Sequence, residues 1–235
     1  ATTGLGISSR GLQSSVYEVM LQQTTVTEVV CATEVPNLEV VPSSLALAGA
    51  EIELVTAFSR EHRLDRALET VADDYDIILI DCPPALGLLT INALTAANWV
   101  LIPVQTEYYA LEGMSQLMNS IKLIQKRINP HLKLFGIALT MYQKTRLCNT
   151  VSSEVRKHFA EHTFATMIPR IISIAEAPLD GAPVVLLKKP NRSNKGSQAY
   201  WALTREVSQR VTSLRQKYGV KEVSRLKLHN LGVGE

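Results

Sequence analysis

The chain alternates between short apolar runs and longer stretches with apolar residues at helical spacing. The short runs predict strands and the longer stretches predict helices. The predicted strands are residues 37–41, 76–80, 99–104, 132–141 and 164–168, and the predicted helices are residues 45–58, 60–72, 86–97, 108–128, 152–161 and 197–218. Strands separated by helices indicate βαβ units, so we expect an α/β fold with a mainly parallel sheet and helices on both faces.

The bulk composition fits one large domain. The chain has 235 residues, 46% of them hydrophobic, which is enough for a core without disulfides or metals. Its formal net charge is +2, so any DNA binding must come from a local patch. The three cysteines are scattered without a CxxC pair, which argues against a zinc site and favours a reducing cytoplasm. No run is long and apolar enough to span a membrane.

The predicted division is a domain at residues 1–218 and a mildly basic tail at residues 219–235. No linker or internal repeat divides the first part, and residues 188–196 are the expected exposed loop. In the predicted helix 108–128, Met114, Leu117, Met118 and Ile121 have the spacing of a core-facing stripe. Basic residues near the C-terminus are interpreted as a solvated helix face: Arg205, Arg210, Arg215, Lys217, Lys221, Arg225 and Lys227.

The sharpest chemical signal is Asp81, in the segment YDIILIDCPP at residues 75–84. Four apolar residues before it predict a strand buried on both faces, with the carboxylate at the carboxyl end. Ligands of open α/β sheets bind at that end, and an aspartate there can help to hold Mg²⁺ in nucleotide-hydrolysing proteins. The same pattern also fits an ordinary strand end whose polar residue reaches water.

The surrounding residues resemble one family. The segments DCPPALGLLTINAL at residues 81–94 and IPVQTEYYALEG at residues 102–113 are similar to the switch region of ParA/Soj partition ATPases. The similarity extends back through residues 45–54 and forward through residues 168–170, 176–178 and 195–196, so it covers the chain to about Val207.

The resemblance implies a P-loop NTPase fold and a cytoplasmic, nucleoid-associated ATPase. Such a protein would bind ATP and Mg²⁺, form a homodimer around ATP, and associate with DNA without sequence preference. A ParB-type centromere-binding protein would stimulate it, and no membrane would be involved. The function implied is chromosome or plasmid segregation.

The resemblance also implies an absent part. Family members begin with a strand, a KGGVGKTT phosphate loop, a helix and a second strand ending in DPQGN. The opening ATTGLG resembles the stretch directly after DPQGN, and no G-x-x-x-x-G-K-[ST] pattern occurs in residues 1–235. Such a loop holds the phosphates through its backbone N–H groups and lysines. We therefore expect this chain by itself to lack the first strand, loop and helix, and to be inactive.

Site residues follow from the family motifs. Asp81 is the expected catalytic and Mg²⁺-associated carboxylate. Pro169 and Arg170 match a segment near the adenine base, and Glu176 and Pro178 match another segment near the nucleotide. Arg170 equally fits a solvated arginine. Tyr108, Tyr109 and Leu111 are interpreted as helix-packing residues rather than stacking surfaces.

The expected DNA contacts are Lys144 and Arg146, in a segment where the family reads MYDARTNL and this chain reads MYQKTRLC. The arginine is displaced by one residue. In another segment, Ile171 and Ser173 replace a typical Asn and Arg. Because basic loop residues supply non-specific DNA binding in this family, we expect weaker DNA binding here.

Two alternatives remain open from the sequence. The chain could be a non-catalytic relative that acts as a dimerisation or interaction module. It could also be a MinD-like ATPase of the membrane surface, since Val223, Leu226 and Leu231 form a weak apolar stripe in the tail. That stripe is thin and lacks Trp or Phe, which argues against membrane binding.

Overall fold

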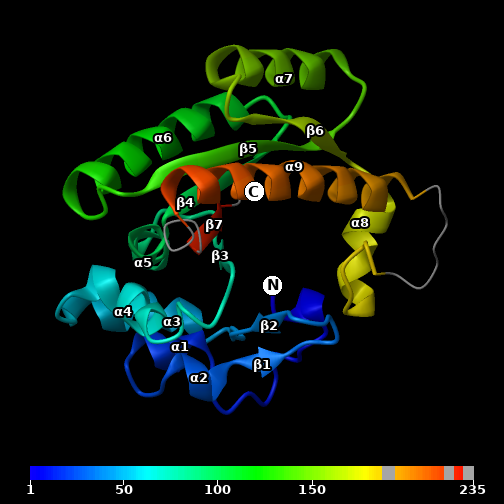
Figure 1. Ribbon diagram of the computed structural model, residues 1–235. Helices are drawn as coiled ribbons and strands as arrows, with labels where there is room; N and C mark the ends of the chain where they lie inside the picture. The colour runs from blue at the N-terminus through cyan, green and yellow to red at the C-terminus, as the bar shows by residue number, and fades with distance from the viewer. Residues whose placement is uncertain (187–193, 220–224, 230–235) are drawn as a thin grey trace.

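The computed structural model describes residues 1–186, 194–219 and 225–229. Its main sheet is parallel and contains five strands, in the order β3-β7-β4-β5-β6 (Figure 1). The bounds are β3 (Ile78–Cys82), β4 (Trp99–Gln105), β5 (Lys133–Tyr142), β6 (Thr163–Pro169) and β7 (Arg225–His229). A separate antiparallel pair, β1 (Cys31–Ala32) and β2 (Glu39–Val40), lies in the N-terminal part. The expected α/β class with a mainly parallel sheet is therefore confirmed.

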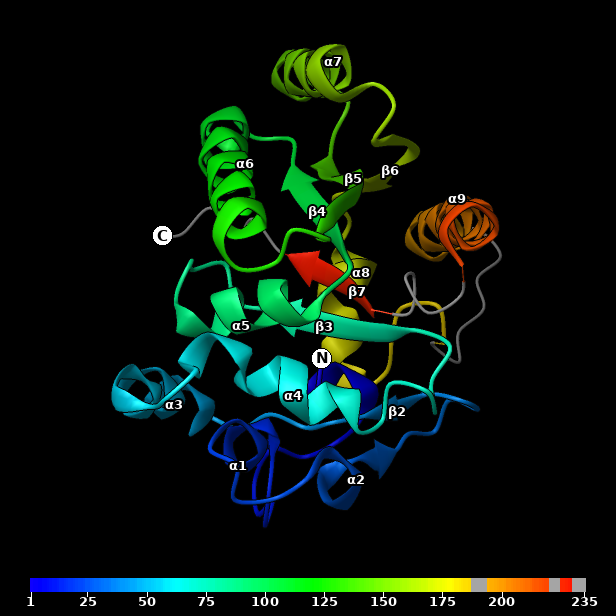
Figure 2. The same cartoon turned by 60° about the vertical axis from the view of Figure 1, so that its left-hand side comes forward.

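Helices cover the sheet on both faces. Figure 2 shows α6 and α9 on opposite sides of the strands. Short helices gather in the N-terminal part, below β3 in Figure 1. The helices are α1 (Val16–Met20), α2 (Val26–Val29), α3 (Leu47–Glu53), α4 (Arg63–Glu69), α5 (Leu88–Ala96), α6 (Ala110–Arg127), α7 (Arg146–Phe159), α8 (Ile172–Glu176) and α9 (Lys195–Tyr218), with 3-10 turns η1 (Thr3–Leu5), η2 (Leu54–Thr56), η3 (Arg60–His62) and η4 (Ala177–Asp180).

Strand β4 shows why the sheet needs both layers. Its alternate residues Val100, Ile102 and Val104 are fully buried in a cluster with α5, α6 and α7. Trp99 and Leu101 pack on the other side, in a cluster that includes Val211 of α9. Successive side chains of a strand point to opposite faces, so a strand that is apolar at every position needs cover on both.

Several element boundaries differ from the predicted ones. β3 ends at Cys82 rather than at residue 80, so Asp81 lies within the strand, and α7 begins at Arg146 rather than at residue 152. The predicted core stripe of α6 is confirmed, since Met114, Leu117 and Ile121 are buried. The expected exposed loop at 188–196 lies mostly outside the described residues. Within the described residues, no helix has both the length and the apolar character needed to cross a bilayer.

One face of β3 is less covered than the sequence predicts. Ile78 and Ile80 pack against the cluster formed by α1, α2 and α4. On the opposite face, Leu79 is 55% exposed and Ile77, just before the strand, is 40% exposed. The prediction of a strand buried on both faces was therefore wrong for β3, because α9 packs over β4, β5 and β6 and does not extend its apolar side over β3.

Arg210 joins α9 to the sheet and is not on a solvated face, contrary to its sequence interpretation. Its Nη1 atom donates hydrogen bonds to the carbonyl oxygens of Phe135 at 2.7 Å and His162 at 3.0 Å. The guanidinium also lies over the ring of Phe164, 4.2 Å from the centroid. Gly136 makes this approach possible, because a Cβ atom there would lie 2.6 Å from the same Nη1 atom. The helix thereby satisfies carbonyl groups of β5 and of the loop before β6.

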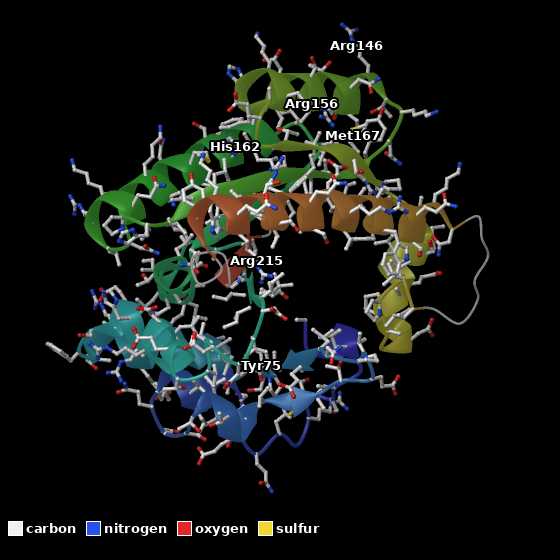
Figure 3. The ribbon with its side chains drawn as sticks, in the orientation of Figure 1. Tyr75, Arg146, Arg156, His162, Met167 and Arg215 are labelled. Carbon is white, nitrogen blue, oxygen red and sulfur yellow. The ribbon has the colours of Figure 1, made fainter. Side chains whose placement is uncertain are left out.

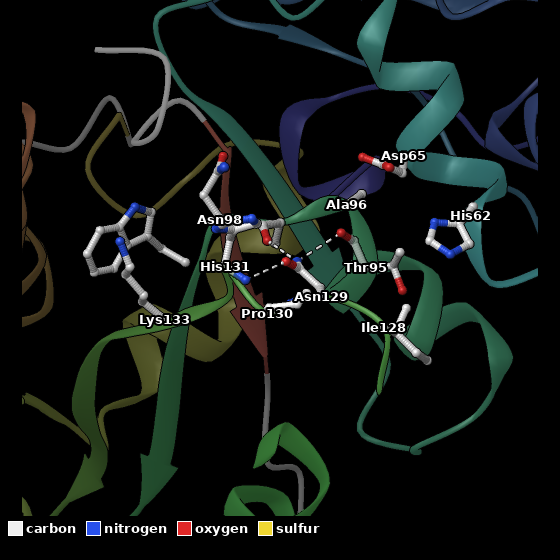
Figure 4. A pocket seen from close by; sticks show the side chains of 12 residues that line it. His62, Asp65, Thr95, Ala96, Asn98, Ile128, Asn129, Pro130, His131 and Lys133 are labelled. Carbon is white, nitrogen blue, oxygen red and sulfur yellow. Dashed lines mark hydrogen bonds between the residues drawn. The ribbon is translucent and has the colours of Figure 1, made fainter. Parts of the chain in front are cut away.

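Asn129 caps the carboxyl end of α5 (Figure 4). Its side-chain amide donates to the carbonyl oxygens of Leu94, Thr95 and Ala97 at 2.8–3.0 Å, and its Oδ1 atom accepts from the backbone N–H of His131. The last carbonyl groups of a helix have no partner within the helix, so this one side chain satisfies several of them. It also lines a pocket of about 400 Å³ at the amino ends of β4 and β5.

Replacing Asn129 should destabilise the fold. We expect Asn129→Ala to lower the free energy of unfolding by about 2 kcal/mol, because several carbonyl groups lose their donor. Urea denaturation followed by circular dichroism measures the change. His131→Ala is the matched control, since that exposed side chain takes no part in the cap and should change stability by less than about 0.5 kcal/mol. Equal stabilities of the two variants would contradict the capping role.

Candidate nucleotide site at the carboxyl edge of the sheet

The carboxyl ends of the parallel strands bring the expected site residues to one edge. Asp81 is the fourth residue of β3, Thr106 and Glu107 follow β4, and Arg170 follows β6. β7 separates β3 from β4, and Leu228 pairs with both Asp81 and Leu101, so Asp81 lies about 10 Å from Leu101 at the usual strand spacing of about 4.8 Å. Gln105, the last residue of β4, lies further along in the same direction. Ligands of such sheets bind at this edge. The pocket of Figure 4 lies at the opposite edge and is not part of this site.

Asp81 is open to cations. Its side chain is 52% exposed, and its Oδ2 atom accepts a hydrogen bond from the amino group of Ala1 at 2.8 Å. The exposed carboxylate can therefore be approached from solvent without displacing core residues. Mg²⁺ in nucleotide sites keeps several waters and needs only one or two protein carboxylates, so an exposed single aspartate fits it. Among the described residues, no cluster of three or more His, Cys, Asp or Glu side chains could hold a metal.

The ends of β4, β5 and β6 are held together by hydrogen bonds. The buried hydroxyl of Thr106 donates to the carbonyl oxygen of Thr140 or of Met141, each at 3.3 Å. The backbone N–H of Thr106 also donates to the carbonyl oxygen of Thr140, at 3.0 Å. The backbone N–H of Arg170 donates to the carbonyl oxygen of Tyr142. Met141 has a φ of 53°, a left-handed conformation that is rare outside glycine and often found at functional sites.

Arg170 and Glu107 form an ion pair across this edge. Their Nη1 and Oε1 atoms are 3.9 Å apart, and the side chains are 61% and 47% exposed. An exposed pair of this kind contributes little to stability. The guanidinium lies near the ends of β4 and β6, which these two residues directly follow. Glu107 was missed in the sequence analysis, although the reasoning used for Asp81, a polar residue at the end of an apolar strand, applies to it as well.

The N-terminal residues connect Asp81 with the segment 176–178. The hydroxyl oxygen of Thr2 accepts from the backbone N–H of Ser43 at 2.9 Å, and η1 packs against η4. Gly6 and Gly181 meet so closely that a Cβ atom on Gly6 would lie 3.1 Å from the carbonyl oxygen of Gly181. Figures 1 and 2 both show the N-terminus beside α8. Glu176 and Pro178, both exposed, are thereby on the same side of the molecule as Asp81.

Lys144 and Arg146 lie at the beginning of α7. Both are exposed, and Figure 3 shows the side chain of Arg146 directed away from the body of the protein. Thr145, between them, caps the helix by accepting from the backbone N–H of Cys148. Burial raises the pKa of the Cys148 thiol, but hydrogen bonds involving Thr106, Thr145 and the Gln143 backbone outweigh it, so the pKa lies below its ordinary value.

Ile171 and Ser173, the two residues that depart from the family pattern, both contact the amino end of α9. A Cβ atom on Gly196 would collide with the side chains of Ile171 and Ile174, so these isoleucines lie directly against the first turn of α9. The hydroxyl of Ser173 donates to Oδ1 of Asn194 at 3.2 Å, and the same oxygen accepts from the N–H groups of Gly196 and Ser197. This side of α8 is therefore occupied by contacts with the amino end of α9.

Tyr108 and Tyr109 do not pack as helix-core residues. They are 73% and 61% exposed, and Leu111 is 36% exposed, so the interpretation as helix-packing residues was wrong. The two rings contact each other edge to face, with centroids 5.1 Å apart. The reason is positional: the residues precede and begin α6 at the carboxyl edge of the sheet, where nothing in the described chain covers them.

Comparison with known proteins identifies the family. Residues 1–134 match the family model described as an AAA domain. The sporulation initiation inhibitor protein Soj of Bacillus subtilis (strain 168) is 49% identical over 209 residues, which are 88% of this chain and 81% of that protein. The chromosome partitioning protein ParA of Myxococcus xanthus (strain DK1622) is 45% identical over 213 residues, 90% of this chain and 74% of that protein.

A solved structure agrees with the fold. The crystal structure of cobyrinic acid a,c-diamide synthase from Mycobacterium smegmatis with bound ADP and magnesium matches with a TM-score of 0.72 and 32% identity, over 93% of this chain and 78% of that one. The α/β sheet is thus of the P-loop NTPase type. Taken with the identities to Soj and ParA, this shows that the chain belongs to the ParA/Soj family of chromosome-partitioning ATPases.

Proposed function

We propose that this chain carries the magnesium-associated carboxylate and the base-side residues of an ATP-dependent DNA-partition protein, and that residues 1–235 alone do not hydrolyse ATP. The observation that carries the first part is Asp81, a carboxylate with a 52% exposed side chain at the carboxyl edge of the sheet. Its proposed role is to hold the water shell of Mg²⁺, the usual task of an aspartate at this place.

The proposed base side consists of Pro169, Arg170, Glu176 and Pro178. Support comes from their position, since β6 ends at Pro169 and η4 contains Pro178, on the side where the N-terminal residues meet η4. Arg170 is exposed and only weakly paired with Glu107, so its guanidinium can turn toward a ligand at little cost.

Residues 1–235 contain no sequence that could bind the triphosphate in the usual way. A phosphate cradle needs a row of backbone N–H groups, usually at the start of a helix, together with a lysine. No G-x-x-x-x-G-K-[ST] pattern occurs in residues 1–235, so these residues do not fit the phosphates. Contact with the base and with Mg²⁺ is therefore the proposed contribution of residues 1–235.

The division into a domain at 1–218 and a tail at 219–235 stays a prediction, although residues 225–229 form β7 within the sheet.

The proposed partners are a second copy of the chain, DNA and a ParB-type protein, in the cytoplasm at the nucleoid and without a membrane. Two relatives are named as chromosome partitioning or sporulation control proteins, which supports the DNA-linked role. Tyr108 and Tyr109 support a dimer, because exposed aromatic residues beside a ligand edge are typical of interfaces. The weak apolar stripe of the tail gives no comparable support to the MinD-like alternative, since Leu226 belongs to a strand of the sheet.

DNA binding can be tested at Lys144 and Arg146. We use an extended protein, in which a family-type strand, KGGVGKTT loop, helix and second strand ending in DPQGN precede Ala1. Replacing both residues with alanine should weaken non-specific binding and reduce the slope of log affinity against log salt by about 0.9 for each phosphate that is no longer neutralised. Fluorescence anisotropy with duplex DNA across a salt series measures both quantities.

The control is the pair Lys126→Ala and Arg127→Ala at the carboxyl end of α6. This pair removes the same charge from exposed positions at the opposite edge of the sheet. An equal loss of affinity in both double variants would show a general charge effect and remove Lys144 and Arg146 from the interface. Ser173→Arg is a poorer test, because it would break the hydrogen bond of Ser173 with the Asn194 cap.

A further inference from the structure

The pocket of Figure 4 lies at the amino ends of β4 and β5, on the opposite edge of the sheet from Asp81. Three parts of the chain form it: the junction of η3 and α4, the turn between α5 and β4, and the loop between α6 and β5. Its volume of about 400 Å³ is typical of small-molecule sites in proteins. The pocket is therefore large enough for an organic ligand of moderate size.

Hydrogen bonds hold the walls of this pocket in place. Asn129 joins the loop before β5 to the end of α5, as described above. The backbone N–H of Lys133 donates to the carbonyl oxygen of Asn98 at 2.9 Å, which fixes the beginning of β5 against the turn before β4. The buried side chain of Asn92, in α5, accepts from the backbone N–H of Leu64 in α4 at 3.2 Å. The shape of the pocket is thus set by the fold itself.

The charged side chains are distributed unevenly along the pocket. Figure 4 shows Lys133 and His131 toward one end, and His62 and Asp65 at the other. Apolar side chains line the space between the two ends, and those labelled in the figure are Ala96, Ile128 and Pro130. One end is therefore basic, the middle is apolar, and the far end carries a carboxylate beside an imidazole.

Lys133 and His131 reach the pocket because of the extended backbone at the beginning of β5. Leu132, between them, is 1% exposed and belongs to the core, and successive residues of an extended segment point to opposite sides. The ammonium of Lys133 lies 3.8 Å from the ring centroid of Tyr218 and 5.4 Å from that of Trp99. Aromatic rings position a cation without removing its charge, so this end of the pocket attracts an anionic group.

We propose that this pocket binds a small organic anion with a flat apolar body, such as an aryl carboxylate or an aryl phosphate. The anionic group lies at Lys133 and His131, where an ammonium and an imidazole can each donate a hydrogen bond. The ring lies along the apolar side chains between the two ends. Asp65 repels a second anionic group at the far end, so the ligand carries its charge at one end. This site is separate from the candidate nucleotide site and does not depend on its function.

The probe is phenyl phosphate, which has an aromatic ring and a single anionic group. Its binding to the unchanged chain is followed by two-dimensional NMR of the backbone amides. We expect a dissociation constant in the millimolar range, as for other ligands of about ten non-hydrogen atoms. The amide signals of residues 95–99 and 131–133 should shift most, and those of residues 78–82 and 106–107 should not shift. Inorganic phosphate, which lacks the ring, and benzyl alcohol, which lacks the charge, should each bind at least about tenfold more weakly.

Two substitutions test the basic end of the pocket. Lys133→Met removes the charge and keeps most of the stem, and His131→Ala removes the imidazole. The affinity for phenyl phosphate should fall by about tenfold and about threefold, respectively. Lys126→Ala is the matched control and should leave the affinity unchanged, since it removes a positive charge from an exposed position near the end of α6, outside the pocket. If Lys133→Met does not fold, as circular dichroism would show, His131→Ala still decides.

A second ligand tests the far end. 4-Carboxyphenyl phosphate carries an anionic group at both ends of its ring, so it should bind to the unchanged chain more weakly than phenyl phosphate does. Asp65→Asn should reduce this difference, because the repelling charge is gone. Tighter binding of 4-carboxyphenyl phosphate than of phenyl phosphate would overturn the assignment of the ligand's charge to one end.

Three results would overturn the proposal as a whole. The first is no binding of phenyl phosphate at concentrations up to about 10 mM, or binding no tighter than that of inorganic phosphate and benzyl alcohol. The second is a set of amide shifts confined to the carboxyl edge of the sheet or to other surfaces. The third is an equal loss of affinity in His131→Ala and Lys126→Ala, which would show a general effect of charge.

Discussion

Titration of ATP and Mg²⁺ into residues 1–235 should give a dissociation constant weaker than about 1 mM, corresponding to less than about 4 kcal/mol of binding free energy. Phosphate contacts contribute most of the affinity for a triphosphate, through backbone N–H groups and lysines at the start of a helix. These residues contain no such loop. Contacts of Arg170 and Asp81 with the base and metal remain, but both side chains are about half exposed and their interactions are screened by water.

The matched measurement uses the extended protein defined above. Its dissociation constant should fall to the micromolar range, and ATP turnover should appear, because the added loop restores the phosphate contacts. Micromolar affinity of residues 1–235 by calorimetry would refute the prediction and would mean that another part of the chain holds the phosphates. An extended protein that binds no ATP would instead favour the non-catalytic alternative, a dimerisation or interaction module.

Asp81→Ala in the extended protein should reduce Mg²⁺-dependent ATP turnover by about 10–100-fold, the usual range for residues that support a metal through its outer shell. The fold should survive, because the Asp81 side chain is 52% exposed and, among the described residues, its hydrogen-bond partner is the exposed amino group of Ala1. Steady-state turnover at several Mg²⁺ concentrations is the measurement. A weakened metal interaction predicts a higher Mg²⁺ requirement as well as a lower rate.

Asp74→Ala serves as the control, since it removes the same charge from an exposed residue just outside β3. It should leave turnover and the Mg²⁺ requirement unchanged. Unchanged turnover in Asp81→Ala would favour the interpretation of Asp81 as an ordinary strand end. A uniform decrease of turnover in both variants would indicate a general effect of charge rather than a metal role.

The candidate site could be predicted from sequence only where local pattern and family motif coincide. Asp81 and Arg170 each follow an apolar strand, and parallel pairing brings such residues to one edge. The Thr106 contacts with Thr140 and Met141 were not predictable, because they join residues 34 and 35 positions apart through a particular strand register. Glu107 could have been found by the same strand-end reasoning, but its pairing with Arg170 could not.

Boundaries and exposure depended on partners that no local window contains. β3 extends to Cys82 because β7 pairs with it as far as His229. Tyr108 and Tyr109 are aromatic, as many core residues are, yet they are exposed. They lie just before α6, which begins at Ala110, so the buried face of that helix does not include them. Arginine is usually a surface residue, yet the Arg210 side chain lies against the sheet, where it donates hydrogen bonds to the carbonyl oxygens of Phe135 and His162.

The sequence by itself determined the α/β class, the parallel sheet, the main helices and the family, because each rests on short-range periodicity or on contiguous motifs such as DCPPALGLLTINAL. Only the tertiary structure decided the order of the strands. Nothing in RLKLH indicates a central strand, since its alternation is typical of a strand with one face in water. Strands pair through backbone N–H and C=O groups, which every residue except proline supplies in the same way. The place of β7 between β3 and β4 therefore depends on how the other strands are arranged and not on its own side-chain pattern.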